Sequence, residues 1–158
     1  MKAKTLALVV TGLVFSSGAL ANTANKCEKV NEQQIEKLFD RWNDSLQTGD
    51  AKKVSMNYLS DAVLLPTVSN KVRLTQDQRV DYFEHFLEKK PVGKIDSRTV
   101  RLGCNTAIDS GTYTFTFSDK STVSARYTFT YEFDGKTWLI SSHHSSAMPE
   151  KVSHTHKA

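Results

Sequence analysis

Apolar residues recur at helical spacing in the first third of the sequence and again near its middle. In the first segment they form one face of a predicted helix: Ile35, Leu38, Phe39, Trp42 and Leu46. Asn31 and Gln34 can form a capping box where this helix begins. Asp50 can cap a short second helix that runs to Tyr58, and Thr75 can cap a third helix. The pattern therefore predicts about three helices in the N-terminal part of the chain.

From residue 94 onward the pattern changes to alternation of apolar and polar positions, which is typical of half-buried strands. Long strands are predicted over residues 95–102, 112–117, 123–133 and 137–145. Residues 62–68 form a short or edge strand, because Pro66 cannot donate to a central ladder, and residues 71–74 a brief partner strand. This order predicts an α+β fold in which the helices pack on one side of a curved, mostly antiparallel sheet. The alternation leaves open whether the aromatic or the Thr-rich face of the strands meets the helices.

The first residues have the order of a secretory signal peptide. Lysines precede an apolar run over residues 6–15, and a stretch of small residues ends at Ala21. A membrane anchor is the alternative, but the run is shorter than the about 20 residues that span a bilayer. We predict a signal peptide over residues 1–21, cleavage after Ala21, a bacterial periplasmic location and no membrane attachment after cleavage. Residues 22–150 form one predicted domain, and residues 151–158 a flexible polar tail.

The composition narrows the class of partner. The 158-residue chain carries a formal charge of +4, which removal of residues 1–21 would lower to +2. That charge is too small for the concentrated basic face of a nucleic-acid-binding protein. Two cysteines, Cys27 and Cys104, remain, and in an oxidising compartment such a pair is typical of a disulfide. A redox pair or two free thiols are the alternatives, although the sequence contains no C-x-x-C motif.

Several segments resemble one known family. Residues 134–140 and 142–149 are similar to the last hairpin and strand of the association (hub) domain of calcium/calmodulin-dependent protein kinase II. They are closer still to small bacterial proteins grouped with that domain and with SnoaL-like proteins, as are residues 38–42 and 61–67. The resemblance covers essentially all of residues 22–150 and implies the cone-shaped nuclear transport factor 2-like fold. It also implies a pocket between sheet and helices, and self-association as a homodimer through the outer sheet face.

Three arginines are candidates for a carboxylate-binding pocket. Arg126 is the strongly basic residue within a Thr/Ser face of a predicted strand, and its guanidinium can bind a carboxylate through a rigid fork of donors. A surface ion pair, with Glu132 for example, is the alternative. Arg98 and Arg101 lie on a neighbouring predicted strand with opposite parity, so at most one of them shares the side of Arg126.

Two adjacent histidines are the next candidates. His143 and His144 point to opposite faces of a strand, so they cannot chelate one metal ion together. Regular alternation places His144 on the face of Trp138 and Ile140, and His144 also resembles a histidine near the end of the hub domain. An imidazole titrates near neutral pH and can act as an acid, a base or a hydrogen-bond donor. A packed histidine at an oligomer contact is the alternative.

Tyr58 and Asp61 lie at the mouth of the cone in this fold, where an isomerase would need a buried carboxylate opposite a donor. No spacing identifies such a pair, and the sequence contains no Gly-rich phosphate loop, nucleophile elbow or zinc motif. We predict no cofactor and no metal site, including at the H-x-H pair His154 and His156. The leading hypothesis is an exported, self-associating, non-catalytic protein that binds a small ligand, with small carboxylates as the candidate class. An isomerase, cyclase or dehydratase and an assembly or interaction module are the alternatives, since this fold hosts all of them.

Overall fold

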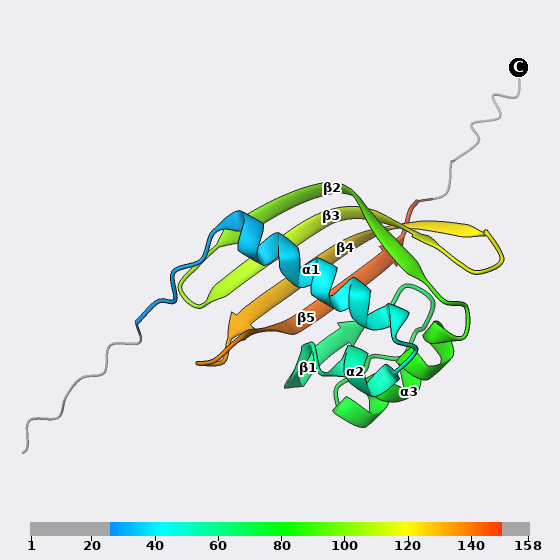
Figure 1. Ribbon diagram of the computed structural model, residues 1–158, viewed down its shortest axis with the longest axis horizontal. Helices are drawn as coiled ribbons and strands as arrows, with labels where there is room; N and C mark the ends of the chain where they lie inside the picture. The colour runs from blue at the N-terminus through cyan, green and yellow to red at the C-terminus, as the bar shows by residue number, and fades with distance from the viewer. Residues whose placement is uncertain (1–25, 150–158) are drawn as a thin grey trace, which may run out of the picture.

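Within residues 26–149, which the computed structural model describes, three helices pack against one face of a curved sheet of five strands (Figure 1). In chain order the elements are α1 (Glu32–Gln47), α2 (Ala51–Ser55), β1 (Tyr58–Leu65), α3 (Gln76–Leu87), β2 (Val92–Leu102), β3 (Thr106–Thr116), β4 (Thr122–Phe133) and β5 (Trp138–Ala147). This arrangement confirms the predicted α+β fold. The predicted signal peptide and the predicted tail lie outside the described residues. No helix of the described part is long and apolar enough to cross a membrane.

The helices begin where their capping residues predict. Helix α1 follows the capping box of Asn31, and α2 follows Asp50, whose carboxylate accepts from backbone N–H groups of the first turn. The predicted extension of α2 to Tyr58 is wrong, because this residue begins β1. The helix stops early because the side-chain amide of Asn57 donates to the carbonyl oxygen of Val54 at 3.1 Å.

The strands lie in the order β1-β5-β4-β3-β2. Strands β2 to β5 pair as antiparallel neighbours, whereas β1 lies at the edge and runs parallel to β5. The strand predicted over residues 62–68 is therefore an edge strand, although it begins earlier and ends before Pro66. The partner strand predicted over residues 71–74 is reduced to one bridge between Leu64 and Arg73.

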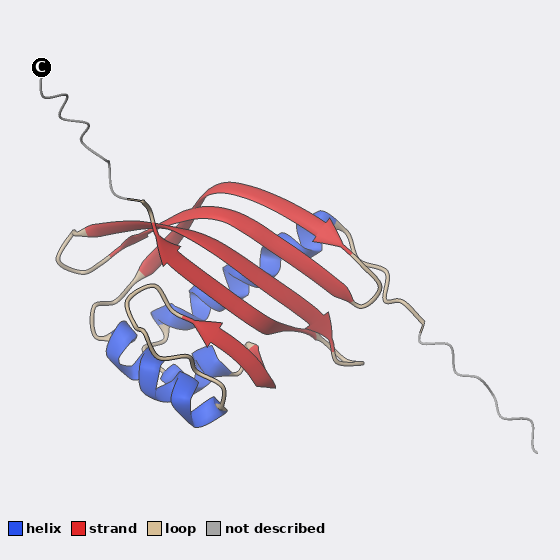
Figure 2. Ribbon diagram, turned by 180° about the vertical axis from the view of Figure 1, so that it is seen from behind, coloured by secondary structure: helices blue, strands red, loops and turns tan. Residues whose placement is uncertain are grey.

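The sheet curves around the helices (Figure 2), and a close approach between β2 and β3 contributes to that curvature. The register of the two strands shifts between Ile95 and Ser97. Gly111 pairs with Arg98, just beyond this bulge, and a Cβ atom there would sit 1.9 Å from the carbonyl oxygen of Ser97. Only glycine lets the two backbones come this close. Since bulges increase local twist, this contact contributes to the curvature of the sheet around the helices.

The aromatic stripes of β3 and β4 meet the helices, which decides between the two faces that the alternation left open. The buried members of these stripes are Tyr113, Phe115, Tyr127, Phe129 and Tyr131. Phe39 and Trp42 of α1 pack edge-on against Phe129, with ring centroids 6.1 and 5.5 Å apart. The Thr-rich positions face the other side, so the inner face of the sheet is the core.

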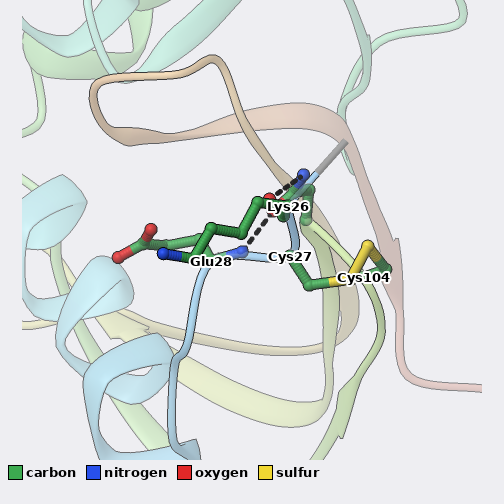
Figure 3. Close-up of a disulfide and its surroundings, with 5 residues drawn as sticks. Lys26, Cys27, Glu28 and Cys104 are labelled. Atoms are coloured by element: carbon green, nitrogen blue, oxygen red, sulfur yellow. Dashed lines mark hydrogen bonds between the residues drawn. A yellow bond between two sulfur atoms is a disulfide. The ribbon is translucent and has the colours of Figure 1, made fainter. Parts of the chain in front are cut away.

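A disulfide joins Cys27 to Cys104, as the sequence predicts (Figure 3). It ties the segment before α1 to the loop between β2 and β3, across a sequence separation of 77 residues. Asn105 in that loop accepts from the backbone N–H of Glu28 at 2.6 Å and donates to the carbonyl oxygen of Lys26 at 3.4 Å. The start of α1 is therefore held against the β2–β3 hairpin by one covalent bond and two hydrogen bonds.

Candidate functional site

A cavity of about 340 Å³ opens between α3, the loop after β1 and the inner face of β3, β4 and β5. Much of its lining is aromatic, including Trp42, Phe83, Phe86, Phe115 and Phe117. Apart from the indole of Trp42, the polar side chains of the lining carry hydroxyls, imidazoles or positive charges. Across residues 26–149 no group of three or more His, Cys, Asp or Glu side chains is placed to hold a metal ion. The size and lining are those of a small-molecule pocket.

A bulge in β5 decides which histidine reaches this cavity. The register of β5 against β4 shifts between Ile140 and Ser142, so Ser141 is an extra residue. Beyond this point the alternation is reversed. His143 is buried, 4 % exposed, and lines the cavity, whereas His144 is exposed. The predicted placement of His144 on the same face as Ile140 is therefore wrong, because regular alternation does not hold across the bulge.

His143 is held by a chain of hydrogen bonds that starts on α1. The Trp42 indole N–H donates to Tyr58 Oη at 3.0 Å, and Tyr58 Oη lies 2.9 Å from His143 Nδ1. Tyr58 Oη accepts from the indole, and Nδ1 is the only acceptor bonded to it among the described residues, so we assign its hydroxyl hydrogen to the bond with Nδ1. Nδ1 is then the acceptor, and the neutral ring carries its hydrogen on Nε2. The chain therefore fixes the tautomer of the imidazole.

Burial keeps this network uncharged. Loss of solvation lowers the pKa of His143 to about 3, so the ring is neutral near pH 7. Burial also raises the pKa of Tyr58 well above its ordinary value. Nε2 of His143 has no hydrogen-bond partner among the described residues, and the ring stacks on Phe129 with centroids 4.0 Å apart. The result is a buried, neutral N–H donor on a side chain that lines the cavity.

A second chain, made of hydroxyl groups, lies on the same wall. Tyr113 Oη donates to Ser145 Oγ at 2.6 Å, and Ser145 Oγ contacts Thr67 Oγ1. Either hydroxyl of the Ser145–Thr67 pair can be the donor, so in both cases one of the two hydroxyl hydrogens stays available. All three residues line the cavity. A ligand therefore meets neutral donors from this chain as well as from His143.

Positively charged side chains form another part of the lining. Arg73 is 9 % exposed, and its guanidinium lies 5.7 Å from the centroid of the Tyr82 ring. Its Nε has no hydrogen-bond partner among the described residues, and its ion pair with Asp81 is long, 4.0 Å. Lys89 is exposed and lies 5.8 Å from the centroid of Phe117. An anionic group in this part of the cavity would find Arg73 available for pairing.

Two of the predicted pocket residues lie on the other side of the sheet. On β4, Arg126 stands between Ala125 and Tyr127, which are buried on the inner face, so its side chain is exposed on the outer face. Arg101 follows the buried Val100 and is exposed on the same outer face. The expectation that these arginines line the cavity is corrected, because strand alternation directs both away from it.

Tyr58 and Asp61, which the resemblance places at the mouth of the cone, take different positions. Tyr58 is buried behind His143, and Asp61 is exposed on β1. Sequence reasoning misses the residue that shapes this strand, the buried Arg79 of α3. Its guanidinium donates, at 2.7–3.0 Å, to the carbonyl oxygens of Leu59, Ser60 and Ala62. Arg79 therefore stabilises the irregular pairing of β1 with β5 that brings Tyr58 to His143.

Sequence reasoning also misses a buried ion pair on the other side of Phe129. Asp109, 0 % exposed, accepts from Tyr127 Oη at 2.8 Å, and both of its oxygens lie 3.2 Å from Arg98 Nε. Glu36 on α1 lies 3.8 Å from Arg98 Nη1. Burial raises the pKa of Asp109, although Tyr127 and Arg98 oppose the shift. The sequence does contain one signal for this ion pair. Asp109 falls on the aromatic stripe of β3, where a carboxylate needs a partner.

Comparison with known proteins gives a family. Residues 31–149 match the model of the calcium/calmodulin dependent protein kinase II association domain. A solved structure described as such an association domain, from Xanthomonas campestris, is 52 % identical to this chain, with a TM-score of 0.73. That match covers 80 % of this chain and 96 % of the other. No curated protein matches this chain.

More distant solved structures share the fold alone. A nuclear transport factor 2-like protein from Pseudomonas putida is 18 % identical with a TM-score of 0.67, and the match covers 77 % of this chain and 89 % of that one. A nuclear transport factor 2-like superfamily protein from Salmonella enterica is 16 % identical with a TM-score of 0.63, covering 78 % and 94 %. These likenesses confirm the predicted cone-shaped fold.

Proposed function

We propose, since this chain belongs to the calcium/calmodulin dependent protein kinase II association domain family, that it is an exported, self-associating protein that binds a small ligand in its cone pocket without catalysing a reaction. The observation that supports ligand binding is the N–H of His143, which is buried without a partner among the described residues and belongs to a side chain that lines an aromatic cavity. An unpartnered buried donor costs about 1–3 kcal/mol, and a ligand acceptor would remove that cost.

Binding without chemistry fits the state of the polar groups. A general base for catalysis near neutral pH needs a pKa close to 7, whereas the pKa of His143 is about 3. The hydroxyls of Tyr113, Ser145 and Thr67 bond one another, whereas a nucleophile needs an activating base. The positive charge of Arg73 favours an anionic group on the ligand. Small carboxylates are therefore the first class to test.

A thermal-shift screen over aromatic and aliphatic carboxylates tests ligand binding. We expect at least one compound to raise the unfolding temperature of the wild-type protein. Val123→Trp places a large ring at the partly exposed edge of the cavity and should abolish that shift. Arg126→Ala, on the outer face of the same strand, is the matched control and should leave the shift unchanged. A shift that survives Val123→Trp, or that disappears in Arg126→Ala, would contradict binding in the cavity.

Export is proposed from the signal peptide predicted over residues 1–21. The disulfide between Cys27 and Cys104 supports it, because such bonds persist in oxidising compartments such as the periplasm. Expression in a bacterial host, followed by fractionation and mass spectrometry, should find the protein in the periplasm with Asn22 as its first residue. An uncleaved chain that stays in the cytoplasm would contradict export.

Self-association as a homodimer is proposed from the family, whose model describes an association domain. The outer sheet face supports it, because Ile108 is 42 % exposed there, between Arg101 of β2 and Thr130 of β4. Sedimentation velocity at micromolar concentration should give a dimer, and Ile108→Lys should shift the protein toward monomer. A wild-type monomer under these conditions would contradict the proposal.

A further inference from the structure

We infer that the ligand of this cavity has two different polar ends: a neutral carbonyl-type oxygen that accepts from His143, and an anionic group that pairs with Arg73. A flat aromatic body joins the two ends. The chemical class is an aromatic acid with a ketone or quinone oxygen at the end remote from the acid. This inference rests on the proposed ligand-binding function and adds the class and the orientation of the ligand.

The His143 end of the cavity selects a neutral acceptor. Nε2–H is a single donor on a ring packed among aromatic side chains: Phe129 stacks on it at 4.0 Å, and Trp42 meets it edge-on at 5.4 Å. A carboxylate placed here would lose its solvation without meeting an opposite charge, because the ring stays neutral. Burial of an unpaired ion costs far more than burial of a hydrogen-bonded carbonyl. The donor therefore favours a ketone, quinone or amide oxygen.

The Arg73 end selects an anion. The backbone of Arg73 is fixed by two hydrogen bonds of 3.0 Å to Leu64, and its guanidinium lies over Tyr82. The ion pair between Arg73 and Asp81 is long, 4.0 Å. The Arg73 side chain is 11 % exposed, whereas the Asp81 side chain is 60 % exposed, so the carboxylate of this pair is mostly solvated. A guanidinium offers a fork of donors that fits a carboxylate or a phosphate. Lys89 adds a second positive charge to the exposed part of the lining.

Aromatic side chains make up much of the remaining wall. Phe86 and Phe115 form an edge-to-face pair with centroids 5.5 Å apart, and Trp42 meets Phe115 edge-on at 6.2 Å. Such a wall offers both ring faces and ring edges, which suits a flat aromatic ligand. A cavity of about 340 Å³ has room for a molecule of one or two fused rings.

Three matched naphthalene probes test the orientation by isothermal titration calorimetry on the purified protein. An acetyl-naphthoate carries both polar ends. Its isopropenyl analogue keeps the shape and the acid but replaces the ketone oxygen with a methylene group. Its naphthamide analogue keeps the ketone but removes the charge. We expect the keto acid to bind the wild-type protein about tenfold more tightly than either analogue.

Two substitutions separate the two ends. In His143→Phe the keto acid and its isopropenyl analogue should bind equally, while the preference for acid over amide persists. In Arg73→Met the acid and the amide should bind equally, while the preference for the ketone persists. His143→Gln, which keeps a side-chain N–H donor, should restore part of the ketone preference. Circular dichroism checks folding, and Lys89→Met, with a smaller loss of acid preference expected, replaces Arg73→Met if that variant is unfolded.

Several results would overturn the inference. If the ketone preference survives in His143→Phe, the ligand carbonyl does not accept from His143. If the ketone preference is lost in Arg73→Met, the ligand lies in the opposite orientation. If the wild-type protein binds none of the three probes, the ligand class is wrong. The thermal-shift screen separates that result from failure of the proposed function. If another carboxylate raises the unfolding temperature of the wild type but not of Val123→Trp, the cavity is still a binding site. If no carboxylate raises the unfolding temperature, both proposals are wrong.

Discussion

Two buried polar clusters lie in one row of the sheet and are separated by a single aromatic ring. Asp109 on β3, Phe129 on β4 and His143 on β5 are register partners across the inner face. On one side of Phe129, Asp109 pairs with Arg98. On the other side, His143 bonds Tyr58. The two clusters illustrate two different physical reasons for burying polar side chains.

In the Asp109 cluster, the negative charge of the buried carboxylate is balanced by the positive charge of Arg98. Its carboxylate accepts from Tyr127 and pairs with Arg98, which also reaches Glu36 on α1, so the cluster joins the sheet to a helix. The His143 cluster is uncharged, ends in an N–H without a hydrogen-bond partner among residues 26–149, and borders a cavity. The first cluster therefore joins elements of the fold, whereas the second leaves one donor for the ligand that the proposed function requires.

The largest effect is expected from removing one partner of the ion pair. Arg98→Met leaves the carboxylate of Asp109 buried without its cation, and the free energy of unfolding should fall by about 3–5 kcal/mol in urea denaturation. The double variant Arg98→Met/Asp109→Leu removes both charges and should recover most of that loss. A single-variant loss below about 1 kcal/mol would mean that the pair contributes no more than a surface ion pair.

Tyr58→Phe is expected to cost about 1–3 kcal/mol, because it leaves the Trp42 indole N–H and His143 Nδ1 without hydrogen-bond partners. The same change removes the hydroxyl that fixes the tautomer of the imidazole. Nitrogen NMR of His143 should show one tautomer, with its hydrogen on Nε2, in the wild type and a mixture in Tyr58→Phe. A single tautomer in both proteins would show that another contact orients the ring.

The two clusters should respond to acid with opposite signs. The pKa of His143 is about 3 when folded and about 6.5 when unfolded, so below about pH 6.5 the unfolded state takes up this proton first. Stability should then fall by up to about 1.4 kcal/mol per pH unit until His143 itself titrates. Asp109 has a raised pKa, so the folded state binds its proton more readily. The Asp109 contribution should therefore rise as the pH falls toward the unfolded value of about 3.9.

Urea titrations of the wild type and of His143→Phe isolate the first of these effects. The stability of the wild type relative to the variant should be constant above about pH 6.5 and should decrease steadily below it. Asp109 and the surface carboxylates are present in both proteins, so their contributions cancel in the difference. A difference that does not change with pH would contradict a buried, neutral His143.

The smallest effect on stability is expected from His143→Phe at neutral pH. The ring keeps its packing on Phe129, and the lost hydrogen bond to Tyr58 is partly offset by removal of the unpartnered Nε2–H. We expect a change within about 1 kcal/mol in urea denaturation, with the loss confined to ligand selectivity. A destabilisation above about 3 kcal/mol would place His143 with Asp109, among the groups that the fold requires.

The sequence predicts the elements of this fold better than the contacts between them. The starts of the helices follow from capping residues such as Asn31 and Thr75, which act locally, and the strands follow from alternation. The end of α2 depends on Asn57, and the irregular course of β1 depends on Arg79 from another helix. Such contacts between elements leave no periodic signal in the chain.

The candidate site is predicted only in part, for the same reason. The sequence singles out the pair His143-His144, but the bulge that selects between them arises from pairing with β4. It identifies Arg126 as an unusual residue, yet alternation alone does not say which stripe faces the helices. The buried ion pair of Asp109 could have been predicted from the sequence, because a carboxylate on an aromatic stripe needs a charged or hydrogen-bonding partner.

The extra residue Ser141 also bears on how site residues are transferred between relatives. In a relative that lacks this residue, β5 would pair regularly with β4, and the residue that aligns with His143 would still face the cavity. Deletion of Ser141 from this chain should likewise leave His143 on the inner face. Positions counted from the start of β5 would nevertheless differ by one between the two proteins. Site residues in this strand are therefore transferred by a gapped alignment, and a count of alternating positions would select the wrong histidine.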